Sequence, residues 1–366
     1  MKKICFIMTE ASQFNILCRG QLEYFSSQPN LEVTLVCGGD YLDIEKLKSR
    51  NIGNVKFIKL VRQPSVFVDF IALIQLFWFF LFNRFDAIVY STPKALLLGS
   101  LSSCFAFQKR RIALVRGRAY ENFAGKKRIF FELLDKVCLK VSHQVIFISN
   151  ELKKMYLNEN LTSKNKSFVI GAGSSNGVDT IKFSPIKFEK NNKLFSIVVM
   201  GRVCFDKGIE DLYKILKDIN SEDLEIKIVG RVEDDESQSV LNNILAEHDY
   251  VKYYNHVDSP AEFFSQADLH LFLSHREGFG NVAIEAASCN TPTFCYDISG
   301  LRDSVLNNVS GKRFLFQDYQ SIARAINDAK ANPDRFKESY SGSRAWVLEN
   351  FSQEKVWEEY LRFYLL

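Results

Sequence analysis

Closely spaced cysteine pairs are absent from this sequence of 366 residues: its eight cysteines are scattered, and no two of them form a CxxC pair. Most of them stand inside apolar runs, such as Ile-Cys-Phe at 4–6. Cysteine behaves as a small apolar residue in such surroundings, and a reducing compartment keeps it as a thiol. The pattern therefore predicts buried thiols in a reducing compartment and gives no sign of a disulfide framework.

The sequence pattern also shows neither a signal peptide nor a membrane-spanning run. Met1-Lys2-Lys3 leads into only five apolar residues before Thr9, too few for a secretory signal. The apolar segment 66–82 has 17 residues but contains Asp69 and Gln75, so it falls short of a comfortable span. We expect a buried or surface-docking helix there, in a cytoplasmic protein. A peripheral position on the inner face of the cell membrane is a further hypothesis.

Charge is unevenly distributed along the chain. Residues 1–175 contain 25 Lys and Arg against 13 Asp and Glu, whereas the remaining residues contain 22 against 30. A basic half suggests an anionic partner, such as a membrane surface, a lipid-linked pyrophosphate or a nucleic acid. Nucleic acid is not favoured, because the arginines are not interleaved with aromatic residues in any recognised module. Basic clusters at 109–111 and 126–128, the second followed by Ile-Phe-Phe, favour peripheral membrane contact.

Length and pattern predict two α/β domains, since 366 residues exceed the usual size of one hydrophobic core. Short apolar runs alternate with helical patterns in both halves, which is typical of parallel sheets covered on both faces. We expect strands at 3–8, 32–37, 56–60, 87–90, 112–115, 145–148, 196–200, 225–229, 251–254, 269–273 and 291–296. The expected helices cover 17–26, 66–83, 94–105, 128–141, 208–218, 237–246, 260–265, 281–288 and 319–332.

The expected domain boundary lies at a glycine-rich hinge, residues 171–177. Residues 1–174 would form one Rossmann-like domain and residues 175–350 a second, with a helix at 351–366 that crosses back to the first. Ligands of doubly wound sheets bind beyond the carboxyl ends of the strands. Two such sheets facing each other would form a central cleft with a binding site on each side.

A glycine-containing turn follows an apolar strand in the segment Ser-His-Arg-Glu-Gly-Phe-Gly-Asn-Val-Ala-Ile-Glu at 274–285. Backbone N–H groups at the start of the following helix, together with its dipole, would bind an anion. Gly278 and Gly280 would let the backbone approach a pyrophosphate closely. Glu277 and Glu285 are good acceptors for sugar hydroxyls, although these carboxylates could equally pair with surface cations.

A second group of residues favours the binding interpretation. The strand at 196–200 ends in Gly201-Arg202, and Asp206-Lys207-Gly208 follows before a helix. Arginine offers a planar fork for phosphate and lysine a mobile point charge. Both side chains would project from the carboxyl end of the first strand of the second domain, where a ligand is expected.

Taken together, these motifs resemble the retaining glycosyltransferases of family 4, which have the GT-B fold. The resemblance is carried by the Glu-x7-Glu segment 277–285, by Gly-Arg and Lys-Gly at 201–208, and by the segments 175–179, 183–185 and 299–303. It is strong over residues 168–366 and extends to the first half by pattern alone. It implies transfer of a sugar from a nucleotide-sugar donor, UDP- or GDP-linked, to a lipid-linked or oligosaccharide acceptor in surface polysaccharide synthesis.

The resemblance also implies roles for individual residues. Arg202 and Lys207 would hold the donor pyrophosphate, Glu285 the ribose hydroxyls, and Glu277 the transferred sugar near its anomeric carbon. Backbone amides around Asn281 and Val282 would complete the phosphate cradle, while the loops at Arg231 and Val257 would flank the base. The expected catalytic residues are Glu277, Arg202 and Lys207, and the expected donor site comprises Arg202, Lys207, Gly278, Phe279, Gly280, Asn281, Val282, Glu285, Arg231 and Val257.

The first half departs from the family pattern. Thr9-Glu10 and the residues after them replace the usual Gly-Gly loop, and Arg116-Gly117-Arg118 stands where many relatives have a histidine. We therefore expect Arg116, Arg118 and Glu10 on the acceptor side, with the two arginines facing an anionic acceptor.

No metal or other cofactor is expected. Departure of a nucleoside diphosphate builds negative charge, and fixed cationic groups stabilise that charge as it develops. Glu233-Asp234-Asp235 is interpreted as an acidic turn that enters a helix rather than as a metal site.

Three other functions compete with this interpretation. A dinucleotide-dependent enzyme is not supported, because no helix pattern follows Gly171-x-Gly173 and Pro185 comes too soon. A nucleotide-sugar hydrolase or epimerase of the same fold stays open, since its donor site would look identical. A non-catalytic scaffold is disfavoured by the presence of Arg202, Lys207, Glu277 and Glu285.

Overall fold

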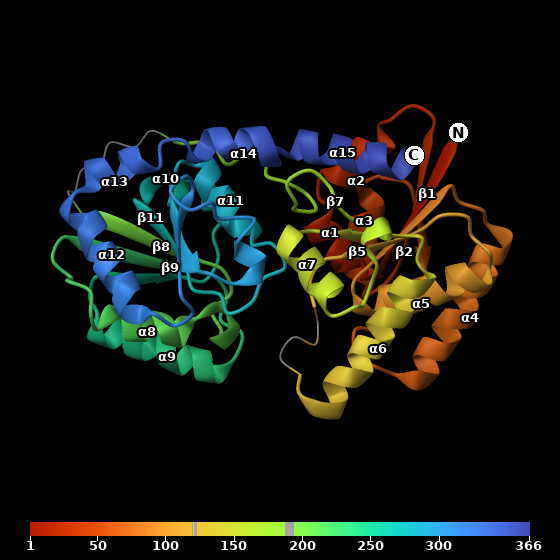
Figure 1. Cartoon of the computed structure of the whole chain (residues 1–366), viewed down its shortest axis with the longest axis horizontal. Coiled ribbons are helices and arrows are strands. Elements are labelled where there is room, and N and C mark those ends of the chain that lie inside the picture. The colour runs from red at the N-terminus through yellow and green to blue at the C-terminus, as the bar shows by residue number, and fades with distance from the viewer. Residues whose placement is uncertain (119, 121–122, 187–193) are drawn as a thin grey trace. The chain divides into compact units, whose positions relative to one another are not determined.

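The computed structural model describes residues 1–118, 120, 123–186 and 194–366, and they form two compact α/β units (Figure 1). The first unit comprises Met1–Gly177 and Gln353–Leu366, and the second comprises Val178–Ser352. The chain thus changes unit after Gly177 and after Ser352, three and two residues later than the boundaries expected from the sequence.

The first unit is built on a parallel sheet of seven strands in the order β3-β2-β1-β4-β5-β6-β7. The strands are β1 (Lys2–Glu10), β2 (Leu31–Gly38), β3 (Asn54–Phe57), β4 (Ala87–Ser91), β5 (Arg111–Val115), β6 (Gln144–Phe147) and β7 (Ser167–Val169). The central strands are apolar along almost their whole length because both faces of the sheet are covered. The strand order reverses between β1 and β4, as in a doubly wound sheet, so this part of the fold prediction is confirmed.

The strands of this unit are connected by the helices α1 (Ala11–Leu17), α2 (Gln21–Ser26), α3 (Tyr41–Ser49), α4 (Val66–Phe82), α5 (Pro93–Phe105), α6 (Gly125–Val141) and α7 (Asn150–Asn158), with a short turn η1 (Lys164–Lys166) before β7. The last helix of the chain, α15 (Gln353–Leu365), also belongs to this unit. Within the described residues, no helix is both long and apolar enough to cross a membrane.

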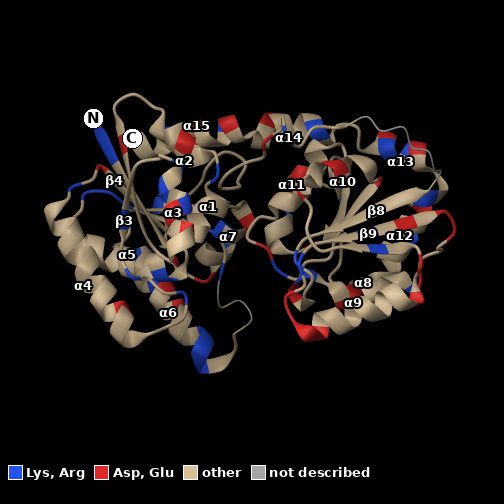
Figure 2. Ribbon diagram, turned by 180° about the vertical axis from the view of Figure 1, so that it is seen from behind, with Lys and Arg blue, Asp and Glu red and all other residues tan. Residues whose placement is uncertain are grey.

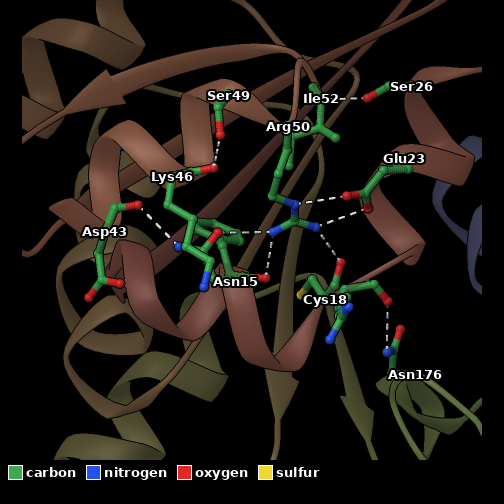
Figure 3. Close-up of polar contacts among 12 residues, drawn as sticks. Asn15, Cys18, Glu23, Ser26, Asp43, Lys46, Ser49, Arg50, Ile52 and Asn176 are labelled. Carbon is green, nitrogen blue, oxygen red and sulfur yellow. Dashed lines mark hydrogen bonds and ion pairs between the residues drawn. The ribbon is translucent and has the colours of Figure 1, made fainter. Parts of the chain in front are cut away.

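The single helix expected over 17–26 is wrong, because the chain breaks between α1 and α2. Gly20 has φ +79°, a backbone conformation that interrupts a helix. Arg50 holds the break: its guanidinium donates to the carbonyls of Phe14 and Cys18 and pairs with Glu23, with Nε 2.8 Å from Oε1 (Figure 3).

The C-terminal helix α15 is part of the core of the first unit. The ring of Tyr364 packs edge-on against Phe6 and Phe25, and the hydroxyl of Tyr360 donates to the carbonyl of Ser174 at 2.9 Å. Arg110 donates to the last carbonyls of this helix, those of Phe363 and Tyr364, at 2.6 and 2.7 Å. Arg110, one of the basic residues of the 109–111 cluster, therefore caps the C-terminus of α15.

The second unit has six parallel strands in the order β10-β9-β8-β11-β12-β13. They are β8 (Phe195–Met200), β9 (Leu224–Val229), β10 (Val251–Tyr254), β11 (Leu269–Phe272), β12 (Thr293–Tyr296) and β13 (Gly311–Phe314). The helices are α8 (Ile209–Leu216), α9 (Asp235–Glu247), α10 (Pro260–Gln266), α11 (Asn281–Ser288), α12 (Tyr319–Ala331), α13 (Pro333–Ser339) and α14 (Ser343–Phe351), with short turns η2 (Phe205–Lys207) and η3 (Ser299–Leu301). The prediction of a second doubly wound sheet is confirmed.

The ends of β8 and β9 approach each other very closely. Gly230, just after β9, has φ +148°, and a Cβ atom there would lie 1.7 Å from the carbonyl oxygen of Gly201, just after β8. Only glycine at position 230 lets the segments after β8 and β9 leave the sheet side by side. Arg202 is the residue directly after Gly201, so this contact helps to fix its position.

Gly230→Ala should therefore destabilise the second unit by about 2–4 kcal/mol, because it combines a disfavoured φ with a steric clash. Gly201→Ala shares the φ of 148° but meets open space, so it should cost less. Gly342→Ala, at a helical φ of −79° with no neighbour within 4 Å, is the matched control and should be nearly neutral. Thermal unfolding of the three variants checks the order, and equal losses would contradict it.

Candidate functional site

Two neighbouring strands of the second unit bring the expected donor residues together. β8 pairs in parallel with β11, so their carboxyl ends lie at the same edge of the sheet. The loop after β8 carries Arg202 and ends in η2 with Lys207, whereas the loop after β11 carries Glu277. Gly208 follows with φ +79°, and a Cβ there would lie 2.3 Å from the carbonyl oxygen of Leu273. This close approach packs the two loops against each other.

Lys207 and Glu277 form an ion pair at this edge. The ammonium of Lys207 contacts Oε1 of Glu277 and lies 3.4 Å from the hydroxyl of Ser274. Their side chains are 20% and 16% exposed, so water screens the pair less than it would on the open surface. The structure thus places a cation and a carboxylate side by side, both still accessible to a ligand.

Arg202 forms a second ion pair, with Glu233. One guanidinium nitrogen lies 2.7 and 2.8 Å from the two carboxylate oxygens, and this contact lowers the pKa of Glu233. The next residue, Asp234, accepts from the N–H of Ser237 at 2.7 Å and caps α9, as expected for an acidic turn entering a helix. Across the described ranges, no group of three or more His, Cys, Asp and Glu side chains could hold a metal ion.

The start of α11 is shaped by two glycines. Gly280 precedes the helix with φ +80°, and a Cβ there would lie 2.4 Å from a methyl group of Leu301. A Cβ on Gly300 would lie 2.0 Å from the carbonyl oxygen of Glu277. The turn η3 therefore presses against the loop that carries Glu277. N–H groups in the first turn of a helix lack intrahelical acceptors and attract anions, so Asn281 and Val282 stand where a phosphate cradle was expected.

Two expected donor residues have distinct environments. The side chain of Phe279 is 3% exposed and packs against Phe351, with ring centroids 5.4 Å apart, so it belongs to the core and offers a ligand only its backbone. Glu285 lies one turn into α11 and is half-buried. Burial raises the pKa of its carboxyl group to about 7, and the charge of Lys182 opposes that effect only in part.

Arg231 and Val257 lie farther along the same edge of the sheet. Arg231 follows β9 and is exposed, whereas Val257 follows β10 and is half-buried. Since β10 and β9 lie beside β8, the loops expected to flank the base continue the row that starts at Lys207 and Arg202.

Sequence reasoning missed a buried polar network beneath the site. Asp211, on α8, is 2% exposed and accepts from the hydroxyls of Tyr296 and Tyr319 at 3.0 and 2.8 Å. Nε2 of His275 lies 2.6 Å from the same carboxylate. This network ties the helix after Lys207 to the loop that carries Glu277. Only the position of His275 next to Ser274 in the motif could have pointed to it.

The residues expected on the acceptor side belong to the first unit. Arg116 donates to Ser91 Oγ at 2.9 Å, to Ser175 Oγ, and to Cys18 Sγ at 3.6 Å. Glu10 ends β1, and its N–H donates to Gln13. Both side chains stay partly exposed at the carboxyl ends of the strands.

Arg118 is engaged differently. Its side chain is 2% exposed and pairs with Glu159 through two nitrogens. The guanidinium lies over the rings of Tyr120 and Tyr156, at 5.2 and 5.0 Å from their centroids. Of the two arginines expected to face an acceptor, Arg118 is therefore buried in an ion pair and Arg116 stays partly exposed.

Comparisons with known proteins bear on the family and the fold. Residues 180–344 match the model of the glycosyl transferases group 1. The capsular polysaccharide biosynthesis glycosyltransferase CapM of Staphylococcus aureus is 30% identical over 369 residues, covering 98% of this chain and 95% of that protein. An N,N'-diacetylbacillosaminyl-diphospho-undecaprenol α-1,3-N-acetylgalactosaminyltransferase of Campylobacter jejuni is 22% identical over 76% of both chains. HepE of Anabaena, solved with UDP and glucose, has the same fold, with a TM-score of 0.79, 17% identity and 99% coverage of both chains.

The raised pKa of Glu285 predicts a pH dependence of stability. An unfolded glutamate loses its proton near pH 4.3, and the folded one only near pH 7. The folded state therefore binds more protons between these values, so this group's contribution to stability falls as pH rises through that window. Glu285→Gln should accordingly raise the melting temperature more at pH 8 than at pH 5. The control, Glu262→Gln on the exposed side of α10, should show no such pH trend, and a parallel trend in both variants would contradict the assignment.

Proposed function

The chain belongs to the glycosyl transferases group 1 and is a glycosyltransferase of polysaccharide biosynthesis, and from this premise we propose that it transfers a sugar from a nucleotide-sugar donor, with retention of configuration, to a lipid-linked acceptor. The observation that carries the proposal is the contact between Lys207 and Glu277 at the carboxyl ends of two adjacent strands. A doubly wound sheet binds its ligand at such strand ends.

The donor pyrophosphate would take the place of two carboxylates. Arg202 pairs with Glu233 and Lys207 with Glu277, so each cation has a partner that an incoming phosphate can replace. The exchange would free the carboxylate of Glu277 to accept hydroxyls of the sugar. Charge that builds on the leaving nucleoside diphosphate would then meet two fixed cations and the start of α11, which lowers the barrier to its departure.

The rest of the donor would lie along the same edge. The half-buried Glu285 would accept the ribose hydroxyls, and the loops at Arg231 and Val257 would flank the base. Uracil and guanine are the bases we propose, in a UDP- or GDP-linked donor. HepE, which shares this fold, was solved with UDP and glucose, and this supports trying uridine nucleotides first.

For the acceptor we propose a saccharide on a lipid carrier at the inner face of the cell membrane. The name of the Campylobacter jejuni relative includes a diphospho-undecaprenol acceptor, and the Staphylococcus aureus relative serves capsular polysaccharide synthesis. Arg116 stays partly exposed at the strand ends of the first unit, and its charge suits a pyrophosphate. The excess of basic residues in residues 1–175 points the same way.

Lys207→Ala and Arg202→Ala should each lower kcat by about 100- to 1000-fold, since each removes a group that stabilises the leaving charge. Lys217→Ala, an exposed lysine just after α8, is the matched control and should keep full activity. Donor binding can be followed separately with a thermal-shift panel of UDP-, GDP-, ADP- and CMP-sugars. A donor present at 100 times its Kd stabilises the protein by about 2.7 kcal/mol.

Full turnover by a folded Lys207→Ala or Arg202→Ala variant would refute the phosphate assignment. For the same nucleotide sugars, release of the nucleoside diphosphate is also measured without any acceptor. Release of nucleoside diphosphate at the same rate without acceptor would identify a hydrolase of the same fold.

Transfer should survive removal of divalent metals, because we propose that Arg202, Lys207 and the start of α11 neutralise the pyrophosphate. The measurement is initial rate after dialysis against EDTA, with and without added Mg²⁺ or Mn²⁺. Loss of activity on dialysis that either ion restores would count against a metal-independent mechanism.

A further inference from the structure

The helix α4 is apolar on both of its faces. Ala72, Leu76 and Phe80 form a buried stripe, and the helix packs on α5. The opposite face is exposed and equally apolar, with exposed fractions of 39–77% at Phe67, Phe70, Ile71, Ile74, Trp78 and Phe82. Figure 2 shows α4 almost entirely in the colour of uncharged residues. A surface helix of a soluble domain carries polar residues on its outer face, so this face needs a cover.

Neighbouring segments extend this surface. Arg84 donates to the carbonyl of Ala106 at 2.6 Å and Gln108 to that of Phe80 at 2.6 Å, which joins the end of α4 to the turn after α5. Phe105, the last residue of α5, and Phe107 in the turn are 61% and 81% exposed. On the other side, Phe57 of β3 lines a cavity of about 540 Å³ together with Trp78 and Phe82. We call these residues the α4 face: Phe57, Phe67, Phe70, Ile71, Ile74, Trp78, Phe82, Phe105 and Phe107.

The carboxylates near the α4 face already have partners. Asp69, the acidic residue of α4, pairs with Lys94 at 2.7 Å. On α6, which also packs on α5, Glu132 pairs with Arg128 at 2.7 Å, and Asp135 accepts from two tyrosine hydroxyls.

Four exposed lysines lie on elements that border the α4 face or pack on its neighbour α5. Lys56 and Lys59 line the cavity with Trp78, and Lys126 and Lys127 begin α6, the blue start of that helix in Figure 2. Within the part of the chain that the structure describes, no carboxylate pairs with any of these four lysines. The surroundings of the α4 face are thus apolar and positively charged.

We propose that the α4 face docks flat on an anionic lipid leaflet. Its aromatic side chains would insert between the acyl chains, and the four lysines would contact the headgroup phosphates. A helix of 17 residues is about 25 Å long, and an interfacial helix of this kind lies in the membrane plane. Charge complementarity selects the occupant, because a neutral protein partner would leave the lysines unused. The inference deepens the proposed lipid-linked acceptor, but its first test requires no turnover.

Docking on α4 would also orient the acceptor edge of the first unit. Helices that follow parallel strands begin at the edge where the strands end, so α4 and α6 both start beside the edge that carries Arg116. The ion pair of Lys94 with Asp69 fixes the start of α4 to the start of α5, directly after β4. A leaflet covering α4 would therefore present its headgroups next to Arg116.

Trp78 provides a direct probe among the three tryptophans, because it is 50% exposed, whereas Trp357 is 7% exposed and Trp346 packs against Phe351 in the second unit. The full-length protein is mixed with vesicles of phosphatidylglycerol and phosphatidylcholine at low salt. We expect co-sedimentation, a blue shift of tryptophan emission, and quenching by brominated lipid that Trp78→Phe abolishes. High salt should weaken binding, since the Debye length falls from about 10 Å at 0.1 M to about 3 Å at 1 M.

The decisive comparison uses two triple variants. Phe67→Ser, Phe70→Ser and Ile74→Ser together should weaken vesicle binding at least about tenfold, because they remove inserted apolar area. Leu42→Ser, Leu306→Ser and Leu348→Ser remove three exposed leucines elsewhere and should leave it unchanged. Both proteins should bind the nucleotide donor as the wild type does, which tests the proposed function separately.

Three outcomes would overturn the inference: a wild-type protein that ignores anionic vesicles while still binding nucleotide, vesicle binding that the α4 variant retains, or unquenched Trp78 in the bound state. A dimer that the α4 variant dissociates, without vesicle binding, would show that a second copy covers the face instead.

Discussion

Parallel pairing of β8 with β11 is the constraint on which the candidate site of the second unit depends. Two strands that are far apart in the chain end at the same edge, so the loops that follow them must share one small space. Gly208 and Gly300 allow the loops to pass within contact distance of Leu273 and Glu277, where any side chain would intrude. Lys207 and Glu277 meet because of this crowding, and the local sequence around each of them does not require it.

The charged side chains at this edge form two ion pairs. Arg202 pairs with Glu233 although its side chain is 57% exposed, whereas Lys207 and Glu277 are largely covered, with side chains 20% and 16% exposed. Below them the buried carboxylate of Asp211 is satisfied by two tyrosine hydroxyls and by His275. A buried carboxylate is tolerated only with such partners, and here the same bonds hold α8 against the loop of Glu277. The network thus connects packing to the position of the charged groups.

The first unit divides its arginines between structure and surface. Arg50, Arg110 and Arg118 are bound to backbone carbonyls or to a glutamate, and they respectively hold a helix break, a helix end and an aromatic pocket. Arg116 is hydrogen-bonded too, yet it stays partly exposed at the strand ends. Counting basic residues along the chain therefore overstates the positive charge available to a partner. The lysines beside the α4 face contribute more of it than the 109–111 cluster.

The sequence by itself determined the two doubly wound sheets, because alternating apolar runs and helical patterns reflect local burial, which each segment records in its own residues. It also located the glycines and charged residues of the candidate site, since residues at strand ends are short-range features. It missed short elements such as α1, α3 and β13. It also started the helix of α2 too early, at residue 17, because Gly20 and the distant Arg50 together break the chain there. Only the tertiary structure decided which cations are paired, that Phe279 faces the core, that Arg118 is buried, and that the outer face of α4 is exposed. Each of these depends on contacts between residues far apart in the chain, and an apolar run looks the same in sequence whether protein covers it or not.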